Sequence, residues 1–479
     1  MAFKIGDRIQ STFLPATIDD YVGAQDPVRV YDAFVDSLHF NQLGIPLIPN
    51  PGAERYDPKK MLKLIIYGYS YGTRSSRLME KACNHNLSFI WLMAGLKPDH
   101  RTIGRFRSDN KDAIKKVLKQ CIRMCIDMKL VDGNTLFIDG SKFRANATIS
   151  STISRQELEK EIANIEKHIE ELVNEVEDTD EKDVKQSSLI EVQEKITDQK
   201  QLAERMKEFI TKMDADKTSS VNTVDPDAVK AKSRQGTHAL YNVQCVTDKK
   251  HGLIVQAEAV SAPNDFQQLK PQMEQAIDNI GHQPQQVCTD AGFFIPTQVA
   301  TIAPAITVIM PSPRQAHEEK SEPVEPGAFD KSYFQYDKEH DRYICPTGKF
   351  LTHQGIDSDR PHRHVYQAKA TDCQKCAHWG TCTSAKRGRK IIRSEHEEII
   401  KRQEAIYKLE PNQAIYRLRK QYAEHPFGHF KRNLNAGQFL LRGRKKVNAE
   451  VSILATCFNI TRMMTIIGIA QLIPAFKGI

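Results

Sequence analysis

The sequence predicts a mixed α/β protein in which an all-helical N-terminal part precedes a sheet with two long insertions. Three observations support this fold class. Helix-type spacing of apolar residues fills residues 1–130, and short strand-like apolar runs recur over residues 131–311. A heptad-like segment at 151–216 and a cysteine-rich segment at 312–390 interrupt that pattern, and helical spacing returns after residue 390.

The bulk composition is that of an ordinary globular protein. The chain has 479 residues, of which 40% are hydrophobic and 27% are charged, enough for about two or three domains. Its polar start indicates no secretion signal, and the apolar run Met463 to Phe476 is short enough to predict a buried helix, not a membrane span. Ten unevenly spaced cysteines without a secretion signal favour a reducing cytoplasm.

Charge is distributed unevenly along the chain. Residues 151–216 hold 19 acidic and 10 basic side chains, a net charge of −9, so the remainder carries +17 against +8 for the whole chain. Residues 385–446 alone hold 17 basic and 6 acidic side chains. A mostly basic chain with one acidic segment favours a polyanionic partner such as nucleic acid. The alternative is that the basic stretches are simply exposed to solvent.

Short helices are expected throughout the N-terminal part. Asp57 and Pro58 have the pattern of a helix start, and Asp99 is expected to cap a basic helix that begins at His100. This helix carries three cations, Arg101, Arg105 and Arg107. Short helices that end in a cation-rich one fit a helix-turn-helix-like reader of DNA. The alternative is a helical subdomain that packs on the core.

The middle of the chain alternates between helices, strands and an insertion. Residues 111–130 predict an amphipathic helix whose Cys121 and Cys125 are more simply core residues than metal ligands. Residues 151–216 predict an antiparallel coiled-coil hairpin, whose acidity favours contact with protein over contact with DNA. Residues 217–236 are polar and predict a flexible loop.

A second group of strands follows this loop. Strands are expected at 239–246, 252–260 and 306–310, with a helix from about 265 to 280. Asp139 and Asp290 each end a short apolar run, in the stretches Leu-Phe-Ile-Asp and Val-Cys-Thr-Asp. A late apolar helix is expected from Asn448 to Ile467.

A late basic segment carries a set of side chains suited to a metal-bound phosphodiester. If it is one helix, Glu424 and Lys431 lie two turns apart on one face, although Pro426 predicts a kink or restart just after Glu424. A carboxylate can hold a cation while the side chains of Tyr416, Arg419 and Lys431 hold phosphate oxygens. The alternative is a solvated helix with ordinary ion pairs.

Four cysteines in the 312–390 insertion have the pattern of a zinc site. They are Cys345, Cys373, Cys376 and Cys382, and they include one Cys-x-x-Cys pair. Zinc would stabilise a segment with too few apolar residues for a core of its own. The alternative is that the four cysteines bind no metal. Trp379 lies between Cys376 and Cys382 and could stack on a DNA base, although it could also simply pack against this cluster.

These motifs resemble those of the insertion-sequence transposases of the DDE type. The resemblance rests on Asp139 in FIDGS, Asp290 in TDAGF and the late signature Tyr416, Arg419, Glu424 and Lys431. Further matching stretches are DPDA at 225–228, YNVQ at 241–244 and PND at 263–265, and the resemblance extends from about Pro15 to Met464. One departure is that four residues, not three, separate Arg419 from Glu424.

The resemblance implies an RNase H-like catalytic domain at 131–311 plus 391–479, and a DNA-binding helical domain at 1–130. Asp139, Asp290 and Glu424 would hold two Mg²⁺ (or Mn²⁺) ions roughly 4 Å apart. The implied reaction is metal-dependent cleavage of DNA ends and strand transfer. Expected partners are double-stranded DNA, at the element ends and the target, and a second copy of the chain in a homodimer. No membrane is involved, and the location is a bacterial-type cytoplasm in association with DNA.

Two other functions compete with this expectation. One is a catalytically inactive transposase that binds DNA as a repressor. The presence of all three carboxylates argues against this function. The other is a simple nuclease without strand transfer, which would need neither the N-terminal helices nor the two insertions.

Overall fold

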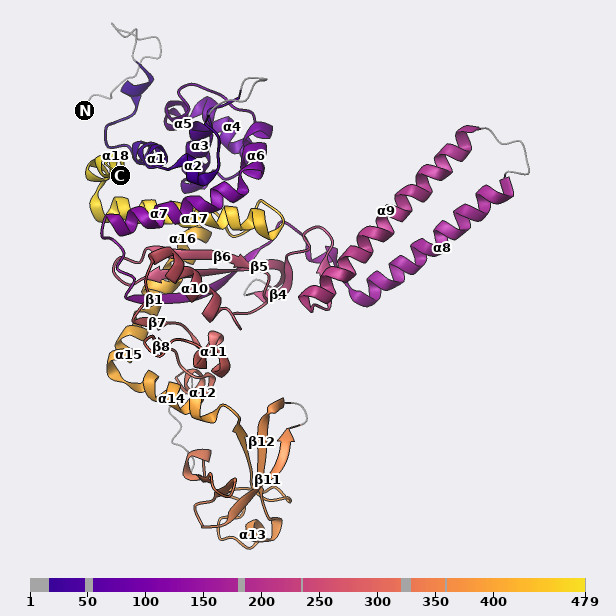
Figure 1. Cartoon of the computed structure of the whole chain (residues 1–479), viewed down its shortest axis with the longest axis vertical. Helices are drawn as coiled ribbons and strands as arrows, with labels where there is room; N and C mark the ends of the chain where they lie inside the picture. Colours follow the sequence, from indigo (N-terminus) through magenta and orange to yellow (C-terminus); the bar gives the residue numbers. More distant parts are fainter. Residues whose placement is uncertain are drawn as a thin grey trace, which may run out of the picture. The chain divides into compact units, whose positions relative to one another are not determined.

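The structure is a computed structural model that describes residues 17–47, 55–179, 186–233, 236–319, 329–357 and 360–478. The chain divides into two compact units. The first comprises Met1–Asp265, Gln272–Gln283 and Lys420–Ile479, and the second comprises Phe266–Pro271 and Pro284–Arg419. Figure 1 shows helices and strands in both units, so the mixed α/β class is confirmed.

The first unit begins with short helices. They are η1 (Ile18–Tyr21), α1 (Pro27–Asp36), α2 (Phe40–Leu43), α3 (Pro58–Ser70), α4 (Ser76–His85), α5 (Leu87–Leu92), α6 (His100–Asp109) and α7 (Lys111–Asp127). The predicted caps are present, because the Asp57 side chain accepts from the Lys59 amide and the Asp99 side chain from the Thr102 amide. These helices share a unit with the sheet, so the boundary expected at residue 130 is not a boundary between units.

Two C-terminal helices, α17 (Arg444–Ile467) and α18 (Ile469–Lys477), pack against these N-terminal helices. By length and composition α17 could cross a membrane, but 67% of its apolar window is buried inside the unit. It packs on α3 and α7 on one side and on strand β6 (Ile254–Val260) on the other. Two buried amides fix it to β6, because Asn448 and Asn459 accept from the Ala259 and Ile254 amides at 2.6 and 2.8 Å. The helix is therefore a core helix.

Antiparallel strands form the sheet of the first unit. β1 (Thr135–Arg144) pairs with β5 (Gly236–Asp248), and β5 also pairs with β6 and with β4 (Val229–Ser233). The register sets Asp139 opposite Cys245 and Gly140 opposite Gln244. Helix α10 (Leu269–Ile280) follows β6.

The polar segment at 217–236 is not the flexible loop predicted from its composition. It contains β3 (Ser220–Asn222), which pairs with β2 (Thr152–Ser154), as well as β4. Its acidic residues are anchors: the buried Asp225 accepts from the Tyr241 hydroxyl at 2.7 Å and from the Gly443 amide at 3.1 Å. Polar side chains here satisfy backbone and hydroxyl donors, which composition alone does not reveal.

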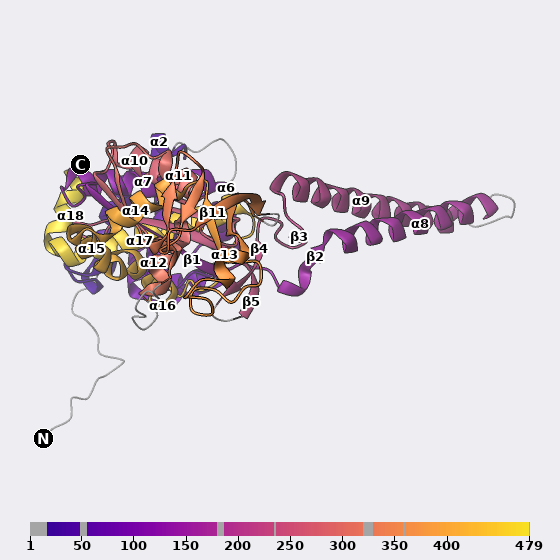
Figure 2. The ribbon, with the colours of Figure 1, turned by 90° about the horizontal axis from the view of Figure 1, so that it is seen from below.

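Two long helices, α8 (Arg155–Thr179) and α9 (Gln186–Asp216), run antiparallel (Figures 1 and 2). Leu158, Phe209 and Met213 form a small core at the base of the pair with Val221 of β3. Ion pairs join the helices, including Lys207 to Glu166 at 2.7 Å and Arg155 to Asp214. The apolar seam predicted from the heptad-like spacing is present where the side chains are described.

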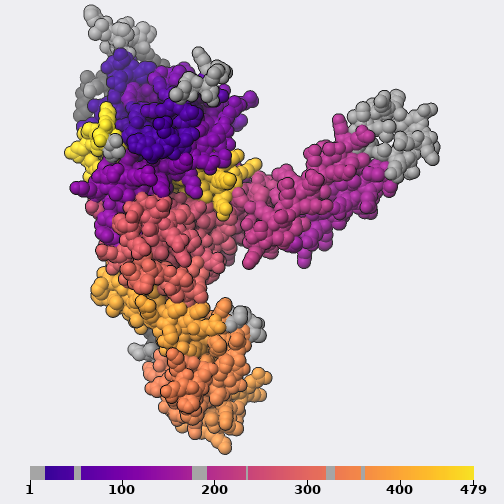
Figure 3. Space-filling view, viewed as in Figure 1, coloured from indigo at the N-terminus to yellow at the C-terminus, as the bar shows by residue number. Residues whose placement is uncertain are grey.

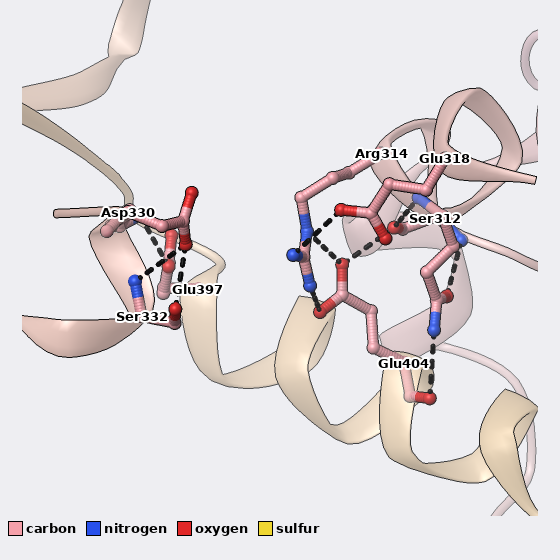
Figure 4. Close-up of polar contacts among 9 residues, drawn as sticks. Ser312, Arg314, Glu318, Asp330, Ser332, Glu397 and Glu404 are labelled. Atoms are coloured by element: carbon pink, nitrogen blue, oxygen red, sulfur yellow. Dashed lines mark hydrogen bonds and ion pairs between the residues drawn. The ribbon is translucent and has the colours of Figure 1, made fainter. Parts of the chain in front are cut away.

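The second unit begins with two parallel strands, β7 (Gln286–Cys288) and β8 (Thr307–Ile309), and short helices η3 (Ala291–Phe293), α11 (Pro296–Ala300) and α12 (Pro313–Glu318). Helices α14 (Glu397–Lys408) and α15 (Glu410–Arg417) follow later. Gln403 of α14 donates to the Val308 carbonyl at 2.8 Å. Glu404 accepts from Ser312 at 2.7 Å and from Arg314 at 2.8 Å (Figure 4). Helix α14 therefore fixes both β8 and α12.

A five-stranded antiparallel sheet occupies most of the cysteine-rich segment. Its order is β13 (Lys390–Ser394), β12 (Arg360–Ala368), β11 (Phe350–Asp357), β10 (Arg342–Ile344) and β9 (Gln335–Asp337), with short helices η4 (Lys331–Tyr333) and α13 (Ala370–Gln374) beside it. The space-filling view shows this segment, in orange, as a compact lobe (Figure 3).

The sheet has its own core, and the expectation that this segment lacks apolar residues for one was wrong. Phe334, Tyr343, Leu351, Tyr366, Ala368 and Ile391 are its buried members. Three of the six are aromatic, and each aromatic side chain buries a large area, so a few of them suffice for a small sheet.

A buried ion pair fixes the N-terminal helices to the C-terminal part of the first unit. Glu450 on α17 is fully buried and pairs with Arg74, which follows α3. The Arg74 guanidinium also donates to the Asn435 and Gln438 carbonyls at 2.5 and 2.8 Å, and Glu450 accepts from the Leu440 amide at 3.1 Å. Removal of one charge would leave the other buried without compensation.

We therefore expect Glu450→Gln to lower the free energy of unfolding by about 3–5 kcal/mol, the usual cost of breaking a buried pair. The exposed pair between Asp278 and Lys119 gives a matched control, because solvent screens this pair and Asp278→Asn should change the stability far less. Denaturant unfolding of both variants measures the difference. Equal stabilities would show that the buried pair contributes no more than a surface pair.

Candidate active site

Asp139 is positioned by β1, whose residues Leu136 to Ile138 are fully buried. The Asp139 side chain is 8% exposed, and its Oδ1 accepts from the Gly140 amide at 2.9 Å. Side chains alternate along a strand, so Phe137, Asp139 and Ser141 point to one face of the sheet.

Two helical segments cover this face around Asp139. They are the π-helix η5 (Lys420–Glu424) and helix α16 (His425–Arg432). Tyr422 of η5 stacks on Phe137 with ring centroids 5.1 Å apart, and Lys431 of α16 donates to Ser141 Oγ at 2.8 Å. These contacts lie on either side of Asp139 along β1. Glu424 lies in sequence between the two contacting residues and is exposed, so it belongs to the segment that covers the Asp139 face.

The helix restarts at Glu424, as Pro426 predicted. Glu424 ends the π-helix and is the N-cap of α16, and Pro426 lies in the first turn, where no intrahelical amide donor is needed. A π turn takes up one residue more than an α turn. This accounts for the extra residue between Arg419 and Glu424, because the insertion is absorbed within the helical path.

Lys431 is held by two contacts. Besides its bond to Ser141, its ammonium lies 4.6 Å from the centroid of the Phe143 ring. A cation over an aromatic face is favourable, and the two contacts direct the charge to the strand residue two positions after Asp139. The side chain is half-buried, so it keeps access to a ligand.

Asp290 lies in the second unit, directly after β7. It caps η3 by accepting from the Gly292 amide at 2.8 Å. Arg419 lies 4.0 Å from Asp290, measured from Nη1 to Oδ2, and its guanidinium is 6.0 Å from the centroid of the Tyr416 ring. The second unit therefore brings together three of the predicted site residues: a carboxylate, a guanidinium and a phenol.

Tyr416 is suited to donate a hydrogen bond. Burial raises the pKa of its phenol to about 12, and the nearby Arg419 lowers it by a smaller amount. The hydroxyl therefore keeps its proton at neutral pH. Tyr407 packs edge-on against the ring at 5.0 Å, which fixes its orientation.

Three residues beside Gly140 were not predicted as site residues, although they belong to the stretches YNVQ and PND that carry the family resemblance. Asn242 and Gln244 of β5 donate to Asp265 Oδ1 at 2.8 and 2.6 Å. A Cβ atom at position 140 would lie 2.1 Å from the same oxygen, so only glycine fits beside Asp139. The motifs YNVQ and PND therefore join the segment after β6 to the strands that carry Asp139.

Two of the three cations predicted on α6 remain candidates for DNA contact. Arg101 and Arg105 are exposed. Arg107 is not a candidate, and this corrects the prediction: it is 7% exposed, and its Nη1 donates to the Tyr69 hydroxyl at 3.0 Å and the Arg74 carbonyl at 3.2 Å. The sequence pattern could not separate it from its neighbours, because all three cations lie on one short helix.

The four cysteines of the second unit line one cavity. Backbone amides donate to three of the sulfurs: Lys349 to Cys345 at 3.2 Å, Arg389 to Cys373 at 3.4 Å, and His378 to Cys376 at 3.5 Å. Cys382 and Trp379 line the same cavity. Three of the four sulfurs therefore accept backbone hydrogen bonds around one cavity.

A different group has ligand atoms closer together. Among the residues that the structure describes, only His362, Glu395 and His396 bring three such atoms within 4.8 Å of one another, and the cysteines do not. His362 Nδ1 lies 3.2 Å from Glu395 Oε2, and His362 and Glu395 are exposed. These three residues are therefore a second candidate site for a cation.

Two protein-family models match the chain. The first, Transposase domain (DUF772), matches residues 16–109, and the second, Transposase DDE domain, matches residues 344–464. The second match includes Tyr416, Arg419, Glu424 and Lys431. Comparison with curated proteins and with solved structures gives no match.

His429 of α16 gives a test of how firmly this helix is held. Burial, and then the nearby His425, lower the pKa of His429 to about 4, below the unfolded value of about 6.5. Between these values the unfolded chain binds more protons, so stability is full above about pH 6.5 and is lost as the pH falls towards 4. We expect wild type to lose about 1–2 kcal/mol more than His429→Gln between pH 7 and pH 5. Parallel losses in denaturant unfolding would contradict this.

Proposed function

We propose that this chain, an insertion-sequence transposase of the DDE type by its matched domains, cuts the DNA ends of its element and joins them to a target. The observation that carries the proposal is the covered face of β1. Asp139 lies on that face between the contacts of Tyr422 and Lys431, and the covering segment carries Glu424. Asp290 and Arg419 supply a second carboxylate–cation pair.

An RNase H-like core is part of the proposal. The order along the chain supports it: β1, then the antiparallel strands β5 and β6, helix α10, and the parallel strands β7 and β8. The catalytic domain would comprise 131–311 and 391–479, with the helical hairpin at 151–216 and the small sheet within 312–390 as insertions.

Asp139, Asp290 and Glu424 would hold two Mg²⁺ (or Mn²⁺) ions. The donor set fits these ions, which are hard and prefer carboxylate oxygens. When bound, such ions lower the pKa of water and stabilise the charge on the leaving oxygen. The buried Asp139, held by the Gly140 amide, would keep one ligand fixed, and Glu424 is exposed to an incoming ligand.

The remaining residues would position the phosphodiester. Lys431 is directed to Ser141 and can neutralise a phosphate oxygen there. The Tyr416 hydroxyl donates a hydrogen bond to a phosphate oxygen, and Arg419 exchanges part of its contact with Asp290 for phosphate when DNA enters. Water attacks first and a DNA 3′-hydroxyl later, so no side chain forms a bond to DNA.

The proposed partners are double-stranded DNA and a second copy of the chain. The basic segment at 385–446 suits DNA, and the acidic hairpin of α8 and α9 suits protein contact in a homodimer on DNA. An inactive repressor and a nuclease without strand transfer are the alternatives. Inverted repeats in the DNA that flanks the gene would identify the substrate, and incubation of those repeats with protein and Mg²⁺ separates the three functions.

A structural zinc ion is proposed in the second unit. Cys345, Cys373, Cys376 and Cys382 line one cavity, and amides donate to three of the sulfurs. Four thiolates form a closed tetrahedral site, so zinc here would fix the end of the small sheet rather than take part in chemistry.

Replacement of any one of the three carboxylates should abolish cleavage. We expect Asp139→Asn, Asp290→Asn and Glu424→Gln each to lose about two orders of magnitude or more in cleavage rate, because each removes a metal ligand worth several kcal/mol in the transition state. Affinity for the uncut DNA should change little.

Glu410→Gln is the matched control, because Glu410 is an exposed carboxylate paired with Arg417. It should cleave at the wild-type rate in the same gel assay of labelled element ends. A near-normal rate for any of the three variants would remove that residue from the active site.

The purified protein should carry about one zinc ion per chain. Cys376→Ser should lose the metal and lower the melting temperature, whereas Cys83→Ala, at a buried cysteine outside the cluster, should keep the zinc. Elemental analysis measures both. Equal zinc content in the two variants would reject the four-cysteine site.

A further inference from the structure

A polar groove of about 580 Å³ opens on the first unit at the far end of the strand that carries Asp139. Three segments line it: the turn between α3 and α4, the end of β1 with the residues after it, and the loop between α16 and α17. The polar lining residues are Arg74, Ser75, Arg144, Asn146, Asn435 and Gln438.

The walls of the groove are fixed by hydrogen bonds between these segments. The Arg144 amide donates to the Gly437 carbonyl at 3.2 Å, and its carbonyl accepts from the Phe439 amide at 2.9 Å. Asn146 donates to the Leu440 carbonyl at 2.7 Å. With the Arg74 bonds described above, the third segment is held on both sides, so the groove exists before any ligand binds.

The charge around the groove is positive. The charged residues that line it are both arginines, Arg74 and Arg144. Arg144 is exposed, and Arg442 donates to the Asn146 carbonyl at 2.8 Å. The carboxylate of Glu450 is fully buried and paired with Arg74, so it does not offset the exposed cations.

The same wall has donors that an anion would satisfy. Helix α4 has ten residues, and its N-cap Ser75 makes no side-chain capping bond, so the first amides of the helix lack that acceptor. Arg74 is 5% exposed, and its Nε is buried without a hydrogen-bond partner. The Arg74 guanidinium is occupied by Glu450 and two carbonyls, so the groups of this groove that can reach an oxyanion are the N-terminus of α4 and the exposed Arg144.

We propose that this groove binds the phosphodiester backbone of the element-end duplex beside the phosphate that is cut. The inference rests on the proposed function, because the partner is the same DNA. Arg144 lies five residues from Asp139 on β1, about 17 Å along an extended strand. This odd spacing turns the Arg144 side chain to the opposite face of β1 from Asp139, so the groove would hold backbone beside the cut phosphate and not the cut phosphate itself. The contact positions the DNA and reads no bases.

Two variants of Ser75 separate DNA contact from stability. Aspartate and asparagine are equally good N-caps, so Ser75→Asp and Ser75→Asn should both keep the wild-type melting temperature or raise it. Only aspartate adds a negative charge to the groove. We expect Ser75→Asp to bind a labelled element-end duplex about tenfold more weakly than Ser75→Asn at 50 mM salt.

Arg144→Ala gives an independent test. The slope of log affinity against log salt concentration should fall by about one unit, because one phosphate contact is lost. Arg123→Ala is the control: Arg123 is an exposed arginine of the same unit, on α7, which does not line the groove. Its slope should equal that of wild type. Fluorescence anisotropy between 50 and 200 mM salt measures all four variants.

The outcomes distinguish the groove from the proposed function. Wild-type protein that fails to bind the duplex would overturn the proposed function. Normal wild-type binding, with equal affinities for the two Ser75 variants or an unchanged slope for Arg144→Ala, would overturn the groove alone. The groove proposal would also be overturned if inorganic phosphate bound there but the variants kept the wild-type affinity for the duplex. The groove would then be a pocket for small anions.

Discussion

The ion pair between Arg74 and Glu450 is the contact on which the arrangement of the first unit depends. One guanidinium, in the turn after α3, binds the only carboxylate on α17 and two carbonyls of the loop before that helix. Residues 376 positions apart are thereby joined at one buried point. A charge pair of this kind adds less stability than apolar packing would, but it tolerates no displacement of its partners, so it fixes geometry.

That geometry has consequences for both surfaces at which we propose DNA binds. The loop held by Arg74 leads back along the chain to α16, whose Lys431 contacts the face of β1 beside Asp139. The same loop forms one wall of the groove at the end of β1. Asp139, Glu424 and the proposed backbone contact therefore all belong to β1 and the segments that cover it. A change in the buried pair would disturb both together.

Much of this arrangement was predictable from sequence, and the failures have physical causes. The strand predicted to end at Asp139 instead continues as β1 to Arg144, because its pairing with β5 extends beyond the apolar run. The restart of the helix near Pro426 and the paired helices within 151–216 follow from local patterns of apolar residues and prolines. Three other features could not be predicted, because each depends on a partner that is distant in sequence. They are the buried position of Arg107, the hydrogen bonds that Asp225 accepts, and the close approach of Asp265 to Gly140. The core of the small sheet was not predicted because only a few aromatic residues form it. The average composition of the segment does not reveal so small a group.

The central claim is that Asp139, Asp290 and Glu424 hold the same metal ions. Iron-directed cleavage of the polypeptide tests it without relying on DNA chemistry. Fe²⁺ replaces Mg²⁺ at such sites, and peroxide with a reductant then generates radicals that cut the backbone close to the bound ion. We expect cuts near residues 139, 290 and 424 that excess Mg²⁺ suppresses and that are all lost together in Asp139→Asn. Cuts at one of the three positions only, or cuts at 290 that persist in Asp139→Asn, would contradict a shared metal site.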